Sequence, residues 1–370
     1  MINKLYIYLL LTLTFTSCMD DDSIHNFNRL DIDEPDYGVF IVNEGNFMYS
    51  NASLSYYNPK TKTVINDIFY NTNALPLGDV AQSMEIKDSL GFIIINNSGK
   101  IYVINTNTFK YVGKITGLTS PRNIIFINDY KAYVSDLYSK TISIINLQNL
   151  TKTGDINIDN NNANFLQHNS ENFIRYKNLV FTNSWSYDDK ILTIDVTTDK
   201  LTDSITVGKQ PNSIVLDKNN KLWVLCDGGF AGSSYGQENA KLIRINPENL
   251  SIEKTFTFDD INVSPFDLCL NNAKDSLFFI YGDWSGAQNI QNSGIYAMSI
   301  NDENLPLSPL INSNGKLFYS LNINPYTNNI YIGDANNFTQ NGKIYRFATN
   351  GTAIDTFNTG IIPGAFSFKK

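Results

Sequence analysis

The 370-residue chain carries 28 basic and 36 acidic residues, a formal net charge of −8, and shows no basic stripe. The chain therefore offers no cluster of basic side chains to a phosphate backbone, and we do not expect a nucleic acid as a partner. Two histidines, His25 and His168, are too few for a histidine-based zinc site or a Ser-His-Asp triad, so we expect no metal, no cofactor and no enzyme. We expect His168 to be a solvated loop residue.

The amino terminus has the pattern of an exported, lipid-anchored protein. Residues 1–17 combine Lys4 with an apolar run too short to span a bilayer, which predicts a signal peptide. The sequence Phe15–Cys18 resembles a lipobox, so Cys18 is expected to carry lipid; a cleaved signal followed by an incidental cysteine is the alternative. Residues 18–37 hold seven acidic residues against Arg29 and predict a flexible tether.

The acidic run that follows Cys18 resembles the export signal of lipoproteins on the outer face of the outer membrane in Bacteroidota. The run is Asp20–Asp22, separated from Cys18 by one methionine. We therefore expect an outer-membrane protein that faces the cell exterior and contacts the membrane through its lipid anchor only. Without the tether, residues 38–370 carry 26 basic and 29 acidic residues, so the folded part is expected to be nearly neutral.

A short strand pattern that ends at a turn recurs through the rest of the chain. It appears seven times at intervals of roughly 40 to 55 residues, and periods of this length indicate an array of small sheets. The copies are Leu54–Asn58, Ile101–Asn105, Ile142–Asn146, Ile191–Asp195, Leu242–Asn246, Ile295–Ser299 and Ile344–Ala348.

Each copy lies between further strand patterns, which gives four strands per unit. An apolar strand rich in Val, Ile, Phe and Tyr precedes it, and a short strand follows it. Most units open with another strand, in which a proline often stands three residues before an apolar position, as in Pro121 to Ile124, Pro211 to Ile214, Pro265 to Leu268 and Pro363 to Phe366. Seven such units predict an all-β fold, a seven-bladed β-propeller over residues 38–370.

The two ends of the array complement each other. The first unit, from Gly38, lacks an inner strand, whereas the last segment, Pro363–Lys369, is an inner strand without a blade. We expect this carboxyl-terminal strand to pair with the amino-terminal blade and close the ring, which removes open sheet edges. An open solenoid is the alternative.

Several other residues have a structural interpretation. Cys226 and Cys269 lie in predicted strands of neighbouring units and are expected to be buried free thiols, with a disulfide as the alternative. Trp223 lies within an apolar strand and is expected in the core. The glycine-rich stretch Gly228–Gly236 lies between two strands, so it predicts a long loop and not a phosphate-binding site.

One face of the ring gathers the candidate binding residues. In a propeller, the connections from second to third strand and those leading into the inner strands open on the same face, around the central channel. Here these connections carry carboxylates, amides and aromatic rings. The residues we expect to bind ligand are Glu44, Asn46, Asp79, Asn97, Asp136, Tyr138, Trp185, Tyr187, Asp227, Phe230, Tyr235, Asp283, Trp284, Asn336 and Phe338.

The polar and aromatic members of this set differ in what they indicate. Each Asn or Asp is also what a turn at a strand end requires, so a structural role stays open for every one of them. Aromatic rings in loops are harder to explain without a partner. A nearly neutral face with rings and amides favours a large uncharged ligand, and binding is a better expectation than catalysis.

The repeat as a whole resembles the YncE-like propellers. The segments Gly38–Asn46, Asn51–Tyr57, Gly78–Val80 and Gly333–Ala335 resemble a narrower group of surface lipoproteins of Bacteroidota that includes the BtuG-type proteins. These proteins capture vitamin B12 and deliver it to a BtuB-like, TonB-dependent outer-membrane transporter. The resemblance implies binding of cobalamin or another corrinoid as a transported ligand. It assigns no contact residue by residue.

Two other functions stay open on the sequence. The same face could bind a protein or glycan partner, with the propeller as a scaffold. A propeller enzyme of the lyase or lactonase type is the third hypothesis, and it would depend on carboxylates such as Asp136, Asp227 and Asp283.

Overall fold

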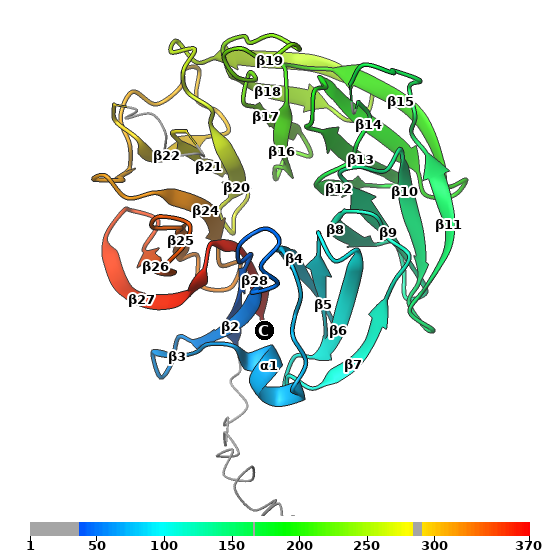
Figure 1. Cartoon of the computed structure of the whole chain (residues 1–370). Coiled ribbons are helices and arrows are strands. Elements are labelled where there is room, and N and C mark those ends of the chain that lie inside the picture. The colour runs from blue at the N-terminus through cyan, green and yellow to red at the C-terminus, as the bar shows by residue number, and fades with distance from the viewer. Residues whose placement is uncertain (1–36, 166, 284–290) are drawn as a thin grey trace, which may run out of the picture. The chain divides into compact units, whose positions relative to one another are not determined.

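The computed structural model describes residues 37–165, 167–283 and 291–370. The predicted signal peptide, Cys18 and nearly all of the predicted tether lie outside these ranges. The described strands form seven four-stranded sheets that are arranged as blades around a central channel (Figure 1). The fold is therefore a seven-bladed β-propeller, as the repeat predicts. Blade A contains both chain ends of the ring, and blades B to G follow in chain order.

The inner strands line the channel and the second strands are the most buried. From blade A to blade G, the inner strands are β28 (Pro363–Lys369), β4 (Ala81–Lys87), β8 (Pro121–Phe126), β12 (Phe173–Tyr176), β16 (Pro211–Leu216), β20 (Phe266–Leu270) and β24 (Phe318–Ile323). The second strands are β1 (Gly38–Asn43), β5 (Leu90–Ile95), β9 (Lys131–Asp136), β13 (Leu179–Ser184), β17 (Leu222–Cys226), β21 (Ser276–Tyr281) and β25 (Ile330–Asp334).

The third strands contain the seven repeat copies, and the outer strands are the most exposed. The third strands are β2 (Ser53–Asn58), β6 (Lys100–Asn105), β10 (Thr141–Asn146), β14 (Lys190–Asp195), β18 (Lys241–Asn246), β22 (Gly294–Ser299) and β26 (Asn341–Phe347). The outer strands are β3 (Thr63–Ile65), β7 (Tyr111–Ile115), β11 (Thr151–Asn157), β15 (Lys200–Thr206), β19 (Ser251–Thr257), β23 (Ile311–Asn312) and β27 (Ala353–Ile361).

The hydrophobic core is divided into clusters that lie between neighbouring blades. Trp223 of blade E and Phe279 of blade F belong to one such cluster, and both are fully buried. The Trp223 indole Nε1 donates a hydrogen bond to Asp217 (2.9 Å), which satisfies its polar edge. Cys226 and Cys269 are buried and free, so the disulfide alternative is wrong and the prediction of buried thiols is confirmed.

The ring closes through the pairing of its first and last strands. Strand β28 pairs with β1 in antiparallel register, from Gly38 opposite Lys369 to Asn43 opposite Pro363. Side chains of blades G and A reinforce this closure, because Arg346 pairs with Asp355 (2.7 Å) and donates to the Tyr57 hydroxyl (2.6 Å). The open solenoid is excluded.

One element departs from the predicted pattern of strands alone. Residues Ile68–Asn73 form a short helix, α1, in the connection between β3 and β4. Six residues show little helical periodicity, and tertiary packing stabilises such a helix more than propensity does. Ile68 and Phe69 are buried, and Phe69 packs on the ring of Tyr102 at 4.9 Å. In the described part of the chain, no helix is long and apolar enough to cross a membrane.

Candidate ligand-binding face

The connections from second to third strands and those leading into the inner strands meet on one face of the ring, which we call the mouth face. Backbone hydrogen bonds join the two kinds of connection in several blades: Ala81 N–H donates to Glu44, Asp227 N–H to Gln210 and Ala335 N–H to Leu317. Every predicted binding residue inside the described ranges lies in or beside one of these connections. Trp284 lies outside the described residues.

The Asp136 carboxylate is held by backbone N–H groups of its own turn and of the connection that leads into β8. One carboxylate oxygen accepts the N–H groups of Thr119 (3.1 Å) and Ser120 (2.8 Å). The other accepts those of Tyr138 (3.0 Å) and Ser139 (2.9 Å). The side chain is buried, and its hydrogen bonds join two connections of the same blade. The structure therefore gives Asp136 a turn-stabilising role.

Asp79 and Asn97 have a similar role in the neighbouring blade. The Asp79 carboxylate accepts the backbone N–H of Met48 with both oxygens (3.0 and 2.9 Å) and the Asn97 amide (2.5 Å). Asn46 donates to the carbonyl of Phe338 (2.5 Å) and exchanges hydrogen bonds with Asn51. These polar residues stabilise the β1–β2 loop. Their hydrogen-bonding groups are used within the protein and are therefore not available to a ligand.

The loop that they hold ends in an apolar tip. Phe47, Met48 and Tyr49 are three consecutive side chains with 64%, 77% and 76% of their surface exposed. Met48 and Ser50, on either side of Tyr49, have positive φ angles of 68° and 53°, so the backbone is tightly turned here. Asn46, Asp79 and Asn97, which we expected to bind ligand, instead stabilise a loop that presents apolar side chains.

Side chains that the sequence pattern did not single out surround the entrance of the channel. Six of the seven inner strands contain a register shift near their first residues, where a β-bulge inserts an extra residue. Bulges of this kind re-aim side chains and are common beside functional sites. Each inserted stretch contributes one residue to the entrance: Gln82, Arg122, Asn212, Asp267, Tyr319 and Gly364.

We call the cavity at this entrance the mouth; its volume is about 190 Å³. The residues that line it, besides those from the bulges, are Glu44, Glu171, Trp185, Asp227, Ser264 and Phe266. Below it, the channel between the inner strands has a volume of about 700 Å³. A sequence signal for the bulges existed, since Arg122, Asn212 and Gly364 each follow the proline that opens an inner strand.

The mouth concentrates ionisable groups. Arg122 Nε pairs with Glu171 at 2.7 Å, and Nη1 donates to Gln82 at 2.5 Å. Glu44 accepts a hydrogen bond from the Tyr319 hydroxyl (3.1 Å). Burial raises the pKa of Glu44 to about 7, although Arg122 and Tyr319 favour its ionised form. Burial also raises the pKa of Asp267 to about 7, against a hydrogen bond from the Leu321 N–H.

Trp185 and Asp227 connect the mouth with a second recess. The Trp185 indole Nε1 donates to Asp227 (2.8 Å), whose pKa burial raises to about 6. Trp185, Asp227 and Ser264 line both cavities, so the two are adjacent. The second cavity, which we call the aromatic recess, has a volume of about 360 Å³. Its ring-bearing walls are Tyr138, Trp185, Tyr187 and Phe230.

Aromatic packing behind the recess fixes two of the predicted rings. Tyr187 stacks on Phe165 (5.6 Å between ring centres) and meets Tyr235 edge-on (6.5 Å). Lys209 lies over the Tyr235 ring at 4.0 Å and donates to the Tyr235 carbonyl. Tyr235 thus supports the wall of the recess and is absent from its lining.

His168 corrects an expectation. Its Nδ1 lies 2.8 Å from Asp188, and 12% of its side chain is exposed. The prediction of a solvated loop residue is wrong, because the connection between β11 and β12 folds back over the turn that contains Asp188. The backbone N–H of His168 donates to the same carboxylate (2.6 Å), which gives the pair a structural role.

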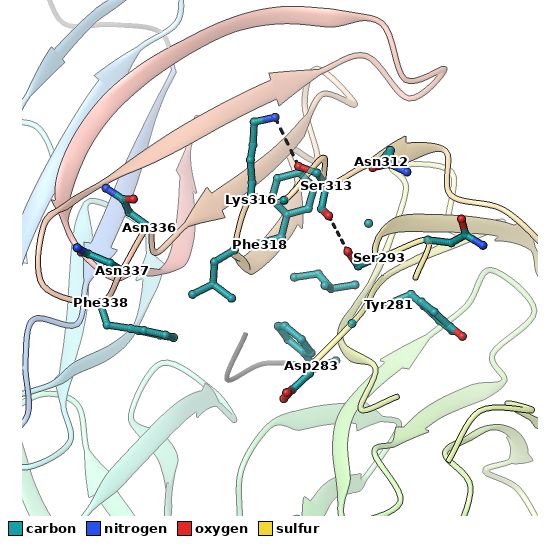
Figure 2. A pocket seen from close by; sticks show the side chains of 17 residues that line it. Tyr281, Asp283, Ser293, Asn312, Ser313, Lys316, Phe318, Asn336, Asn337 and Phe338 are labelled. Carbon is teal, nitrogen blue, oxygen red and sulfur yellow. Dashed lines mark hydrogen bonds between the residues drawn. The ribbon is translucent and has the colours of Figure 1, made fainter. Parts of the chain in front are cut away.

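A third cavity lies between blades F and G. Its volume is about 540 Å³, and Figure 2 shows Asn336 and Phe338 on one side and Tyr281 and Asp283 on another. Ser293 and Ser313 hydrogen-bond to each other at 2.6 Å on its wall. Residues 284–290, which include Trp284, lie outside the described part of the chain. Phe338 also packs edge-on against Tyr319 of the mouth.

The predicted residues therefore fall into separate groups. Tyr138, Trp185, Tyr187, Asp227 and Phe230 meet at the aromatic recess, and Glu44 lies in the mouth. Asp283, Asn336 and Phe338 line the third cavity. Asn46, Asp79, Asn97 and Asp136 stabilise loops. Among the described residues, no group of three or more His, Cys, Asp or Glu side chains is placed to hold a metal ion.

Comparison with known proteins identifies the family and confirms the fold. Residues 37–362 match the model of a family described as a domain of unknown function, DUF5074. A search of curated proteins found no match.

Two solved structures from Bacteroides illustrate the likeness in fold. A quinonprotein alcohol dehydrogenase-like protein from Bacteroides thetaiotaomicron is 15% identical, with a TM-score of 0.66 over 90% of this chain and 78% of its own. A protein from Bacteroides uniformis, provisionally named a 6-phosphogluconolactonase, is 14% identical, with a TM-score of 0.65 over 90% of this chain and 99% of its own. Identities this low support the shared propeller fold alone.

Proposed function

Since the chain belongs to the DUF5074 family, whose description assigns no activity, we propose its function from the mouth face. The proposal is non-enzymatic binding of a large uncharged ligand, with cobalamin or another corrinoid as the first candidate. The observation that carries it is the aromatic recess, where rings from three neighbouring blades surround one cavity.

The recess is built as a preformed stacking site. Tyr138 is 58% exposed and Phe230 is half exposed, so much of the surface of both cavity-lining residues is free for contact with a ligand. Trp185 and Tyr187 are fixed from behind by Asp227 and Phe165. Fixed rings lose little conformational entropy when a flat ligand stacks on them. A cavity of about 360 Å³ accepts the edge of a large ring system, and the face around it accommodates the rest.

The corrinoid candidate combines this geometry with the sequence resemblance. A corrin ring is flat and carries a fringe of amide groups, which suits aromatic walls beside a polar mouth. In the proposed role, the protein is anchored at the cell surface through Cys18 and delivers the corrinoid to a TonB-dependent outer-membrane transporter. The lipobox-like segment Phe15–Cys18 and the acidic run after it support the anchoring part of this proposal.

A titration with cyanocobalamin tests the ligand. We expect saturable binding to the full-length, detergent-solubilised chain, with a Kd of about 1 μM or tighter, measured by calorimetry. A combined Tyr138→Ala and Phe230→Ala change should weaken binding about tenfold, because each stacked ring contributes about 0.5–1.5 kcal/mol.

The matched control is Tyr130→Ala. Tyr130 is 61% exposed, nearly as much as Tyr138, but lies between β8 and β9, at the other end of its blade. Its change should leave the Kd unaltered. Absence of saturable binding at 100 μM cyanocobalamin would end the corrinoid assignment.

The apolar tip favours a second candidate, the binding of a protein partner. Phe47, Met48 and Tyr49 form a contiguous exposed group on a rigid loop, and such patches are typical of protein interfaces. A Phe47→Ser, Met48→Ser and Tyr49→Ser variant should lose the partner in a pull-down from outer membranes and keep the cyanocobalamin Kd. Retention of the partner by this variant would count against the tip as its binding surface.

A further inference from the structure

The mouth has more acidic than basic side chains. Among the described residues that line it, Arg122 is the one basic residue, and four carboxylates accompany it: Glu44, Glu171, Asp227 and Asp267. Arg122 is already paired, since it bonds to Glu171 at 2.7 Å and to Gln82 at 2.5 Å. Glu44, Asp227 and Asp267 form no ion pair with a basic side chain of the mouth, although the charge of Arg122 also favours the ionised form of Glu44.

Glu171 has an acceptor atom without a donor. The residue is 6% exposed, and while Oε2 accepts from Arg122, Oε1 is buried with no hydrogen-bond partner. Buried carboxylate oxygens are nearly always hydrogen-bonded, so the orphan Oε1 of this mouth-lining residue indicates a missing donor. A ligand group rich in N–H donors would supply it.

Glu44 reaches the mouth because its neighbour has no side chain. A Cβ at Gly364 would lie 2.3 Å from Glu44 Oε1 and 2.8 Å from its Cγ. The bulge in the β1–β28 pairing places Gly364 beside this carboxylate. The absence of a side chain at Gly364 leaves room for the Glu44 carboxylate. Burial disfavours its ionised form, and protonation or a nearby cation would reduce this cost.

The walls between the carboxylates are aromatic. Trp185, Phe266 and Tyr319 line the same cavity. Aromatic faces attract ammonium groups, and a site of carboxylates and rings is a common solution for organic cations. A bare metal ion fits less well, because no three carboxylates in the described part of the chain are placed to coordinate one.

We propose that the mouth is a subsite for a primary ammonium group, which donates hydrogen bonds to Glu171 and to the carboxylates around it. An ammonium carries three donors and no acceptor, which matches a cavity dominated by acceptors. The site is distinct from the aromatic recess, so a ligand could place an aromatic or ring portion in the recess and an amine in the mouth. The inference does not depend on the corrinoid assignment.

Proton release should accompany binding. The groups that face the mouth from the surrounding elements are Glu44, Arg122, Glu171, Asp227, Asp267 and Tyr319. Burial raises the pKa of Glu44 and of Asp267 to about 7, so both are partly protonated near neutral pH. An ammonium ion favours their ionised forms, and its affinity should therefore rise with pH.

The test compares 2-phenylethylammonium with its uncharged isostere, 2-phenylethanol. Both are titrated into the full-length protein by calorimetry, at pH 5.5 and at pH 8. We expect the amine to bind at least tenfold more tightly than the alcohol at pH 8, and to lose about tenfold in affinity at pH 5.5. Buffers of different ionisation enthalpy should report protons released on binding near pH 7.

Two variants connect the signal to the mouth. Glu171→Gln and Asp267→Asn should each weaken amine binding about tenfold, and thermal melts establish that each variant is folded. If Glu171→Gln fails to fold because Arg122 loses its partner, Asp267→Asn alone carries the test. The control is Glu303→Gln, an exposed carboxylate that pairs with Lys254 outside the mouth, which should leave amine binding unchanged.

Several results would overturn the proposal. Equal binding of the alcohol, absence of saturation by the amine, or an affinity unaffected by pH would each do so. Calcium or magnesium chloride that binds alone and is lost in Asp267→Asn would assign the mouth to a metal instead. A failed cyanocobalamin titration leaves this outcome untouched, because the amine probe contains no corrin.

Discussion

Asp136 and Asp267 are both acidic residues of the mouth face, yet their surroundings are opposite. The Asp136 carboxylate accepts four backbone N–H groups from two connections of its blade. Asp267 accepts one, from Leu321, and lines the mouth. The first residue stabilises a turn at the end of a second strand, whereas the second is displaced into the channel by a bulge.

This difference separates structure from function on the same rim. A carboxylate at a strand end accepts hydrogen bonds from the unpaired N–H groups of the turn, which leaves it no free acceptor for a ligand. A residue in a bulge leaves the ladder, and its side chain points away from such donors. Candidate binding groups on this propeller should therefore be sought at the bulges of the inner strands before the ends of the second strands.

Isosteric amides give the largest expected contrast. Asp136→Asn replaces one acceptor oxygen by an NH₂ group that faces two N–H donors, so we expect a loss of about 3 kcal/mol in the free energy of unfolding. Asp267→Asn retains its one bond to Leu321 and removes a carboxylate whose ionisation burial disfavours, so it should not lower that free energy. Guanidinium denaturation at pH 7 measures both.

Similar losses in the two variants would show that Asp267 stabilises the fold as much as Asp136 does. Asp267 would then be a structural residue, and its place in a bulge would not indicate ligand binding. The melting transition of Asp267→Asn should be as sharp as that of the unmodified chain.

The stability of the folded chain should depend on pH through two carboxylates of the mouth. The pKa of Glu44 and of Asp267 is raised to about 7 in the folded chain, above the ordinary values of 4.5 and 3.8. The folded protein therefore binds more protons than the unfolded chain between about pH 4 and pH 7, and its stability falls as pH rises through this window.

We expect the free energy of unfolding to be about 5 kcal/mol lower at pH 7.5 than at pH 5 on account of these two groups. A Glu44→Gln and Asp267→Asn double variant should flatten this slope. Urea denaturation across the range measures it. An unchanged slope in the double variant would indicate that the two carboxylates are well solvated.

Two glycines provide the smallest and most local test. Gly364→Ala places a Cβ 2.3 Å from Glu44 Oε1, so we expect a loss of about 1 kcal/mol and a displaced carboxylate. Gly154→Ala in the outer strand β11 meets Ile144 Cδ1 at an ordinary 3.6 Å and should alter stability by less than about 0.5 kcal/mol. Thermal melts of the two variants should differ accordingly.

The fold was predictable because its signal is repeated. Seven copies of one strand pattern fix the number of blades, and the unmatched segment Pro363–Lys369 indicates the closure with β1. Helix α1 was not predictable from pattern, since its six residues depend on the burial of Ile68 and Phe69 under neighbouring strands.

The site was predictable only in part. Loop aromatics such as Tyr138 and Phe230 indicated the recess, because exposed rings stand out in a sequence. The sequence could not distinguish Asp136 from Asp267, since the difference between them lies in the backbone donors that other segments supply. Arg122 and Tyr319 escaped notice because register shifts, which depend on strand pairing, place them in the mouth.

Closure of the ring by the seven-residue strand β28 also has a consequence for biosynthesis. Until β28 has been synthesised and has left the ribosome, β1 has an unpaired edge and Glu44 has no Gly364 beside it. The cavity is complete only when β28 has paired with β1. A polypeptide that lacks β28 therefore presents no finished mouth.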